Sequence, residues 1–204
     1  MTRLATRSLR ELCLMAGVVI ACVAPGSPVR AQTVVPAEEI SNKLASVDTT
    51  ADLNIAELRQ RALDRIKSKA DAAPLKRPPV APELLRLPQV TVEVRFDPDS
   101  SIIRPNSYQT LGLLADAFLR STMLSNTFLI VGHTESTGKR EFNLTLSQRR
   151  ADSIRDALVT TFKISPKRIQ TLGLGEEQMR DAAQPASATN QRFQIVTIAK
   201  APAP

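Results

Sequence analysis

The stretch that decides the fold is GHTESTGKREFNLTLSQRRA, at residues 132–151, which joins a short apolar run to a long helical pattern. Phe128 to Val131 contain no polar residue, and Gly132 ends this expected strand. Asn143 suits the N-cap of an expected helix from Leu144 to Phe162, whose apolar residues recur at helical spacing. A strand, a polar loop and a helix therefore follow one another, and polar side chains gather in the loop.

The flanking sequence continues this alternation of strands and helices. Val90, Val92 and Val94 alternate with polar residues up to Phe96, which indicates a half-buried strand. A helix is expected after Pro105, and two further strands are expected at residues 168–172 and 193–198. The predicted order is strand, helix, strand, helix, strand, strand.

The motifs of this segment resemble those of the OmpA-like peptidoglycan-binding family. That family's pattern reads approximately G-H-T-D-x-x-G, then N-x-x-L-S-x-x-R-A, and later N-R-R. The likeness extends upstream to Phe96-Asp97 and downstream to Gly173-Leu174-Gly175-Glu176 and Asn190-Gln191-Arg192, so it covers about 110 residues. It implies an α/β (α+β) domain at residues 87–200, a βαβαββ two-layer sandwich with two helices on a mixed four-stranded sheet.

The resemblance also implies a ligand and the residues that hold it. The ligand is peptidoglycan, bound non-covalently through the diaminopimelate of its stem peptide, which carries a free ammonium and a free carboxylate. A guanidinium can donate two parallel hydrogen bonds to a carboxylate, whereas an ammonium needs an acid. The family's ammonium-binding aspartate falls on Glu135, and its carboxylate-binding arginine falls on Arg150, expected near the start of its helix, where backbone amides would add attraction. The other predicted ligand-binding residues are Asn143, Thr137, Gln191 and Asp97.

Two positions depart from the family pattern. Glu135 replaces aspartate and adds a methylene group, and Gln191 stands where the family has the first arginine of N-R-R. These changes predict binding that is retained but weakened, or a ligand that differs from the standard stem, and loss of binding stays open. A purely structural alternative is an exposed ion pair between Glu135 and Arg150, worth about 0 to 1 kcal/mol.

The N-terminus has the layout of a secretory signal peptide at residues 1–31. Three arginines within the first ten residues precede an uncharged run from Leu12 to Ala24, and Val29-Arg30-Ala31 supplies small residues for cleavage after Ala31. The run is shorter than the about 20 residues of a membrane-spanning helix. Val19-Ile20-Ala21-Cys22 also resembles a lipobox, with Cys22 as the possible lipidated residue. The protein is therefore expected in the periplasm or at the outer membrane, either soluble or as a lipoprotein.

Residues 32–86 are predicted to form a helical and proline-rich tether. Gln32 to Thr50 is polar and weakly patterned, Asp52 to Lys69 has the spacing of one amphipathic helix, and Ala72 to Pro88 contains five prolines. The helix either belongs to the tether or recruits another envelope protein. The second reading gives the alternative function, an adaptor with weakened or lost peptidoglycan binding.

Composition argues against several other functions. The formal net charge of +7 falls to +4 without residues 1–31, and the chain has no Trp, one Tyr and six Phe. Nucleic-acid binding is therefore not expected, because stacking aromatics and a basic stripe are both missing. With one histidine and no cysteine after Cys22, the sequence offers no nucleophile with its base and no metal set. No enzymatic activity, metal or cofactor is expected.

Overall fold

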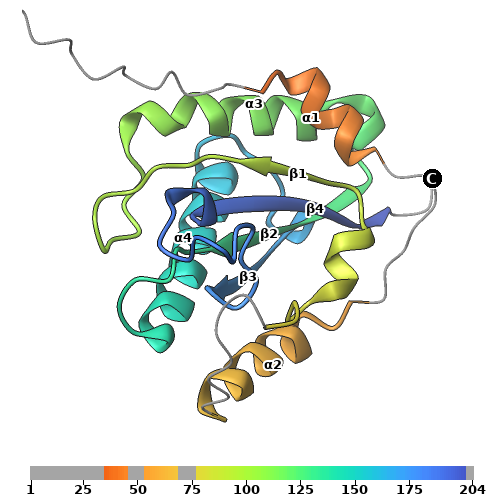
Figure 1. The fold of residues 1–204 in the computed structure, drawn as a ribbon. Coiled ribbons are helices and arrows are strands. Elements are labelled where there is room, and N and C mark those ends of the chain that lie inside the picture. The colour runs from red at the N-terminus through yellow and green to blue at the C-terminus, as the bar shows by residue number, and fades with distance from the viewer. Residues whose placement is uncertain (1–34, 46–52, 69–76, 201–204) are drawn as a thin grey trace, which may run out of the picture. The chain divides into compact units, whose positions relative to one another are not determined.

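A four-stranded mixed sheet lies at the centre of the fold, with helices on both of its faces (Figure 1). The structure is a computed structural model, and it describes residues 35–45, 53–68 and 77–200. The strand order is β1-β4-β2-β3; β2 and β3 run parallel, whereas β4 is antiparallel to both β1 and β2. The strands are β1 (Gln89–Val92), β2 (Asn126–His133), β3 (Ile169–Gly175) and β4 (Arg192–Lys200).

The predicted signal peptide of residues 1–31, its cleavage site after Ala31 and the lipidation candidate Cys22 all lie outside the described residues. The described residues belong to one compact unit, Gln32–Pro204. No helix in the described part of the chain combines the length and the apolar character needed to cross a bilayer.

Helices alternate with the strands from β1 onward, in the order β1, α3, β2, α4, β3, β4. This order and the mixed four-stranded sheet confirm the predicted fold class. The α-helices of the described residues are α1 (Ala37–Leu44), α2 (Ile55–Lys67), α3 (Tyr108–Leu119) and α4 (Arg140–Thr160). Short 3-10 helices occur at η2 (Pro82–Arg86), η3 (Pro105–Ser107), η4 (Ser121–Met123), η5 (Pro166–Arg168) and η6 (Ala188–Asn190).

The central strand β2 explains why both faces of the sheet are covered. Its residues Phe128, Leu129, Ile130 and Val131 are all apolar and fully buried. Successive side chains of a strand point to opposite faces, so two of them enter each side of the sheet. Phe128 and Ile130 belong to a core with residues of α1, α3 and α4, whereas Leu129 and Val131 belong to a second core on the other face.

Helix α2 and the short helix η2 contribute to the second core. Leu58, Ala62 and Ile66 of α2 are buried there, together with Leu84 of η2. The sequence predicted the helix from its apolar spacing, but that spacing does not reveal what the apolar face contacts. The fold therefore has a helical layer on this face that the two-layer prediction did not include. The boundary at residue 87 stays a prediction.

Helix α1 was not expected from the sequence. It offers two large apolar side chains one turn apart, Ile40 and Leu44, and both are buried in the first core. The hydroxyl group of Thr197 in β4 donates a hydrogen bond to the Leu44 carbonyl, at 2.8 Å. Two apolar positions are too few to establish a helical period, which is why this segment reads as weakly patterned.

Helix α4 lies close against the sheet because two glycines permit it. A Cβ atom on Gly132 of β2 would lie 2.4 Å from the carbonyl oxygen of Ser147, and one on Gly173 of β3 would lie 2.4 Å from the backbone nitrogen of Gln148. Side-chain hydrogen bonds fix the same approach, since Ser147 accepts from the backbone N–H of Gly175 at 2.8 Å. The helix is thereby held in a fixed rotation above the ends of β2 and β3.

The start of α4 differs from the prediction. The helix begins at Arg140, its N-cap is Lys139, and the N–H of Asn143 already donates to the Lys139 carbonyl at 3.0 Å. Asn143 is therefore not the N-cap, because its side chain bonds to the preceding loop instead. Arg150 lies in the middle of the helix, beyond the first turn where the helix dipole acts, so the expected attraction from N-terminal amides does not apply there.

Strand β3 lies at one edge of the sheet, and two arginines bond to its carbonyl groups. The side chain of Arg155 in α4 donates to the Ile169 carbonyl at 3.1 Å, and that of Arg59 in α2 donates to the Thr171 carbonyl at 3.3 Å. The opposite edge strand, β1, is only 4 residues long.

Candidate functional site

A cavity of about 300 Å³ lies where the loop after β2 meets α4 and the loop after β1. Five of the six residues predicted to bind ligand line it: Glu135, Thr137, Asn143, Arg150 and Gln191. Phe96, Pro98, Asp99, Thr134 and Leu146 complete the lining. The fold thus brings together residues separated by up to about a hundred positions in the chain.

Arg150 forms the buried cationic part of the cavity. Its side chain rises from α4, and the residue is only 6% exposed. Its Nε donates a hydrogen bond to the Ser100 carbonyl at 2.9 Å, and its guanidinium carbon lies 5.1 Å from the centre of the Phe96 ring. These contacts fix the plane of the guanidinium and combine a hydrogen bond with a cation–π contact.

Two carboxylates act on this guanidinium without forming an ion pair with it. Burial lowers the pKa of Arg150 from its ordinary value, while the charges of Asp99 and Glu135 act in the opposite direction. Within the described residues, Arg150 has no ion-pair partner. The alternative of an exposed Glu135–Arg150 ion pair is therefore wrong, since Arg150 is buried and unpaired by carboxylates in this part of the chain.

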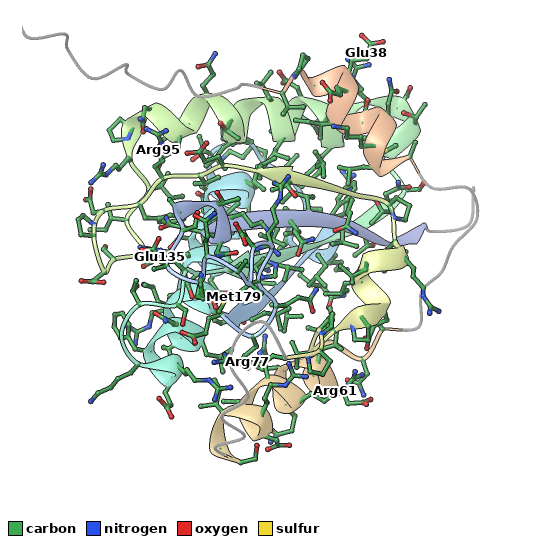
Figure 2. All side chains as sticks on the ribbon, in the orientation of Figure 1. Glu38, Arg61, Arg77, Arg95, Glu135 and Met179 are labelled. Atoms are coloured by element: carbon green, nitrogen blue, oxygen red, sulfur yellow. The ribbon has the colours of Figure 1, made fainter. Side chains whose placement is uncertain are left out.

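The loop between β2 and α4 carries Glu135, which Figure 2 labels. Asn143 is 3% exposed and holds this loop from the first turn of α4. Its amide nitrogen donates to the carbonyl of Thr137 at 2.9 Å and lies 3.3 Å from that of Glu135. The same nitrogen donates to the carboxylate of Glu176 at 2.8 Å. Asn143 therefore positions the loop backbone in addition to lining the cavity.

Asp99, and not Asp97, supplies the acid from the loop after β1. Asp97 does not line the cavity; its carboxylate accepts from Arg104 at 3.1 Å, and both side chains are about half exposed. Asp99 has a positive φ of 49°, which turns the chain so that Asp99 reaches the cavity. No residue pattern indicates this left-handed turn, and Asp97, which was predicted to bind ligand, lies outside the cavity lining.

The three residues Asn190, Gln191 and Arg192 have different roles at the cavity. Asn190 is fully buried, and its side chain accepts from the backbone N–H groups of Arg180 and Asp181 at 3.0 and 2.9 Å. Burial lowers the pKa of Arg192 to about 10, and this side chain donates to the carbonyl of Gln178 at 3.0 Å. Asn190 and Arg192 therefore build the loop, while Gln191 between them lines the cavity.

His133 ends β2 beside the cavity but does not line it. It is 1% exposed, and its Nε2 lies 2.5 Å from the side-chain oxygen of Gln194 on β4. Burial, with a contribution from the charge of Arg192, lowers the pKa of His133 well below its ordinary value. The buried ring is thus neutral and hydrogen-bonded across the sheet.

Residues 95–192, which include all the residues that line this cavity, match the OmpA family, so the chain carries an OmpA family domain over these residues. Outer membrane porin F of Pseudomonas fluorescens is 36% identical over 115 residues, which cover 55% of this chain and 34% of the porin. The peptidoglycan-associated lipoprotein of Brucella melitensis is 36% identical over 103 residues, or 50% of this chain and 60% of the lipoprotein. The chain spans about a third of the length of the porins that it matches.

Among solved structures, the peptidoglycan-associated lipoprotein from Burkholderia pseudomallei is similar over 51% of this chain and 87% of that protein, with 29% identity and a TM-score of 0.43. The relatives are named as an outer membrane porin and a peptidoglycan-associated lipoprotein. The predicted location, the periplasm or the outer membrane, agrees with these names.

Proposed function

We propose that this cavity binds peptidoglycan non-covalently and links the chain to the cell wall of a Gram-negative envelope. The ligand group is the free end of diaminopimelate in the stem peptide, which carries one ammonium and one carboxylate. No covalent step, metal or cofactor belongs to this function, and the chain acts as a binding protein, not an enzyme. The names of the related lipoproteins support the proposal.

The observation that carries the proposal is the state of Arg150. A buried guanidinium without a carboxylate partner has lost much of its hydration, so a carboxylate that entered the cavity would gain a strong, charge-assisted interaction. Its Nε is already used by the Ser100 carbonyl, so the ligand carboxylate would approach the terminal nitrogens. The Phe96 ring restricts the guanidinium to one plane and so reduces the entropy lost on binding.

The ammonium group would lie against Glu135 and Asp99. Both carboxylates line the same cavity as Arg150, and the charge of each acts to raise the pKa of Arg150 against the effect of burial. A zwitterionic ligand can therefore satisfy the cation and the acids at once, whereas a simple anion would meet repulsion from two carboxylates. Gln191 lines the cavity with a neutral amide, and we therefore expect a weaker hold on the carboxylate than a second arginine would give.

The adaptor alternative depended on a free apolar face of α2. Leu58, Ala62 and Ile66, which form that face, are buried against the sheet. A protein partner recruited by this helix would have to bind its polar side, and no observation favours such contacts. Peptidoglycan binding is therefore preferred over the adaptor function.

Co-sedimentation of residues 32–204 with isolated Gram-negative sacculi tests the proposal. Arg150→Ala is expected to remain in the supernatant while the parent pellets. Arg149→Ala is the matched control, because Arg149 is the neighbouring arginine on α4, is exposed and does not line the cavity. If the parent does not pellet, the proposed binding of peptidoglycan is wrong. If both variants pellet equally well, the proposal that this cavity binds it is wrong.

A further inference from the structure

Glu176 is a buried carboxylate that bonds both to the loop after β2 and to the first turn of α4. It directly follows β3 and is 3% exposed. One carboxylate oxygen accepts from the hydroxyl of Ser136 at 2.8 Å, and the other accepts from the amide of Asn143 at 2.8 Å. Ser136 lies between two cavity residues, and Asn143 bonds to the carbonyl groups on either side of it. Glu176 thus fixes the loop without lining the cavity itself.

A cation that contacts this carboxylate, Arg77, comes from outside the OmpA family match at residues 95–192. Nη1 of Arg77 lies 3.4 Å from Glu176 and 3.8 Å from Glu177, and the Arg77 side chain is 12% exposed. Glu177 is in turn bound by two nitrogens of Arg140, at 2.9 and 2.8 Å, in the first turn of α4. Arg77 therefore joins the N-terminal part of the chain to the residues that support the cavity.

The same N-terminal part is attached at two further points. Arg65 of α2 donates to the carbonyl of Pro78 at 2.7 Å, and its contact with the Glu177 carbonyl measures 3.4 Å. The N–H of Ala81 donates to the side chain of Gln178 at 2.9 Å. Arg65, Arg77 and Ala81 thus contact the turn at residues 176–178, and Glu176 of the same turn contacts the cavity loop through Ser136.

We propose that Arg77 and Glu176 are positioning residues for the cavity, so that docking of the segment at residues 77–86 sets the geometry of the loop at residues 134–137 and raises the affinity for ligand. This inference rests on the proposed function. Without the guanidinium, the donors to the buried Glu176 carboxylate among the described residues would be the neutral groups of Ser136 and Asn143, and the carboxylate would gain by turning toward water. Asn143 and Ser136 would then lose a common acceptor, and the loop that carries Glu135 would shift. Because coupling is reciprocal, ligand binding would also strengthen docking of the segment.

The test compares Arg77→Ala with Arg61→Ala in residues 32–204. Arg61 is the matched control, because it lies on α2 and pairs with Glu83 at 2.8 Å but does not contact Glu176; Figure 2 labels both arginines. The probe is a muropeptide that carries diaminopimelate, titrated while the backbone amide signals of residues 135–137 are followed by NMR. We expect Arg77→Ala to shift these signals and to raise Kd by about three- to tenfold, with Arg61→Ala within about twofold of the parent and Arg77→Lys between them.

The outcomes separate this inference from the proposed function. If the parent binds and Arg77→Ala binds equally well, the positioning role is wrong, even where the variant lowers the stability of the fold. If the parent does not bind the muropeptide, the proposed function fails, and the amide signals still decide whether Arg77 sets the loop. Unshifted signals for residues 135–137 in Arg77→Ala would overturn the inference in either case.

Discussion

Replacing Leu58 by alanine should destabilise the whole described fold, although the residue precedes the OmpA family match in the sequence. Leu58 is 1% exposed, and its neighbours in the second core include Leu129 and Leu172 of the sheet, which are fully buried. Leu→Ala changes in cores cost about 2 to 5 kcal/mol, depending on how far the site can collapse. The sheet cannot move toward the cavity left behind, but the outer helix α2 can, so we expect about 2 to 3 kcal/mol. For a unit of this size the melting temperature should fall by roughly 5 to 10 °C.

Urea unfolding of residues 32–204, followed by far-UV circular dichroism, measures this change as a shift of the midpoint at constant slope. Leu85→Ala is the control, because it makes the same chemical change at a leucine that is 52% exposed on η2. An unfolding midpoint for Leu58→Ala equal to that of Leu85→Ala would refute the packing argument. In that case α2 would behave as part of a tether, as the sequence suggested, and its loss would not be transmitted to the sheet.

Two further predictions concern charge. Asp99→Asn should raise the Kd for the muropeptide by about three- to tenfold, because it removes one of the two cavity carboxylates. Asp97→Asn is the control and should change Kd by less than about twofold. A titration in which Asp97→Asn weakens binding more than Asp99→Asn would contradict the assignment of Asp99 to the site. The second concerns His133, whose folded pKa is lowered well below 6.5, mainly by burial. As the pH falls, the imidazole of His133 binds a proton in the unfolded chain before it does so in the folded protein. The free energy of unfolding should therefore fall below about pH 6.5, by at most about 1.4 kcal/mol per pH unit. His133→Gln should remove this contribution to the pH dependence between about pH 6.5 and 5.5. Urea midpoints across that interval that have the same pH dependence in both proteins would disprove the role of His133.

The sequence predicted five residues that line the cavity, but it did not predict that α2 and η2 pack on the second face of the sheet. Glu135, Asn143 and Arg150 were identified because their motif has a characteristic spacing, and the fold does bring them to one cavity. Asp99 was not predicted, because its place at the cavity accompanies a left-handed backbone torsion that no residue pattern reports. Asn143 was expected at the helix N-cap, but its bonds to the loop and to Glu176 are tertiary contacts that a local reading cannot include.

The cover of the sheet was missed for a different reason. The spacing of Leu58, Ala62 and Ile66 shows that α2 has an apolar face, but it does not show which surface that face meets. The run from Phe128 to Val131 carries the missing information, since a strand that is apolar on both sides requires cover on both. The proline-rich stretch before β1 lacks periodicity because it buries single residues such as Leu84 from a short 3-10 helix.

The arginines that bond to β3 have a consequence for self-association. An exposed strand edge is a template on which another chain can add a strand, and proteins resist this with positive charge along the edge and with short edge strands. Here the guanidinium groups of Arg59 and Arg155 occupy carbonyl oxygens that an incoming strand would need. The other edge offers only the four residues of β1. The sheet is therefore protected against growth at both borders, which would keep neighbouring copies from fusing into larger sheets where they are crowded together.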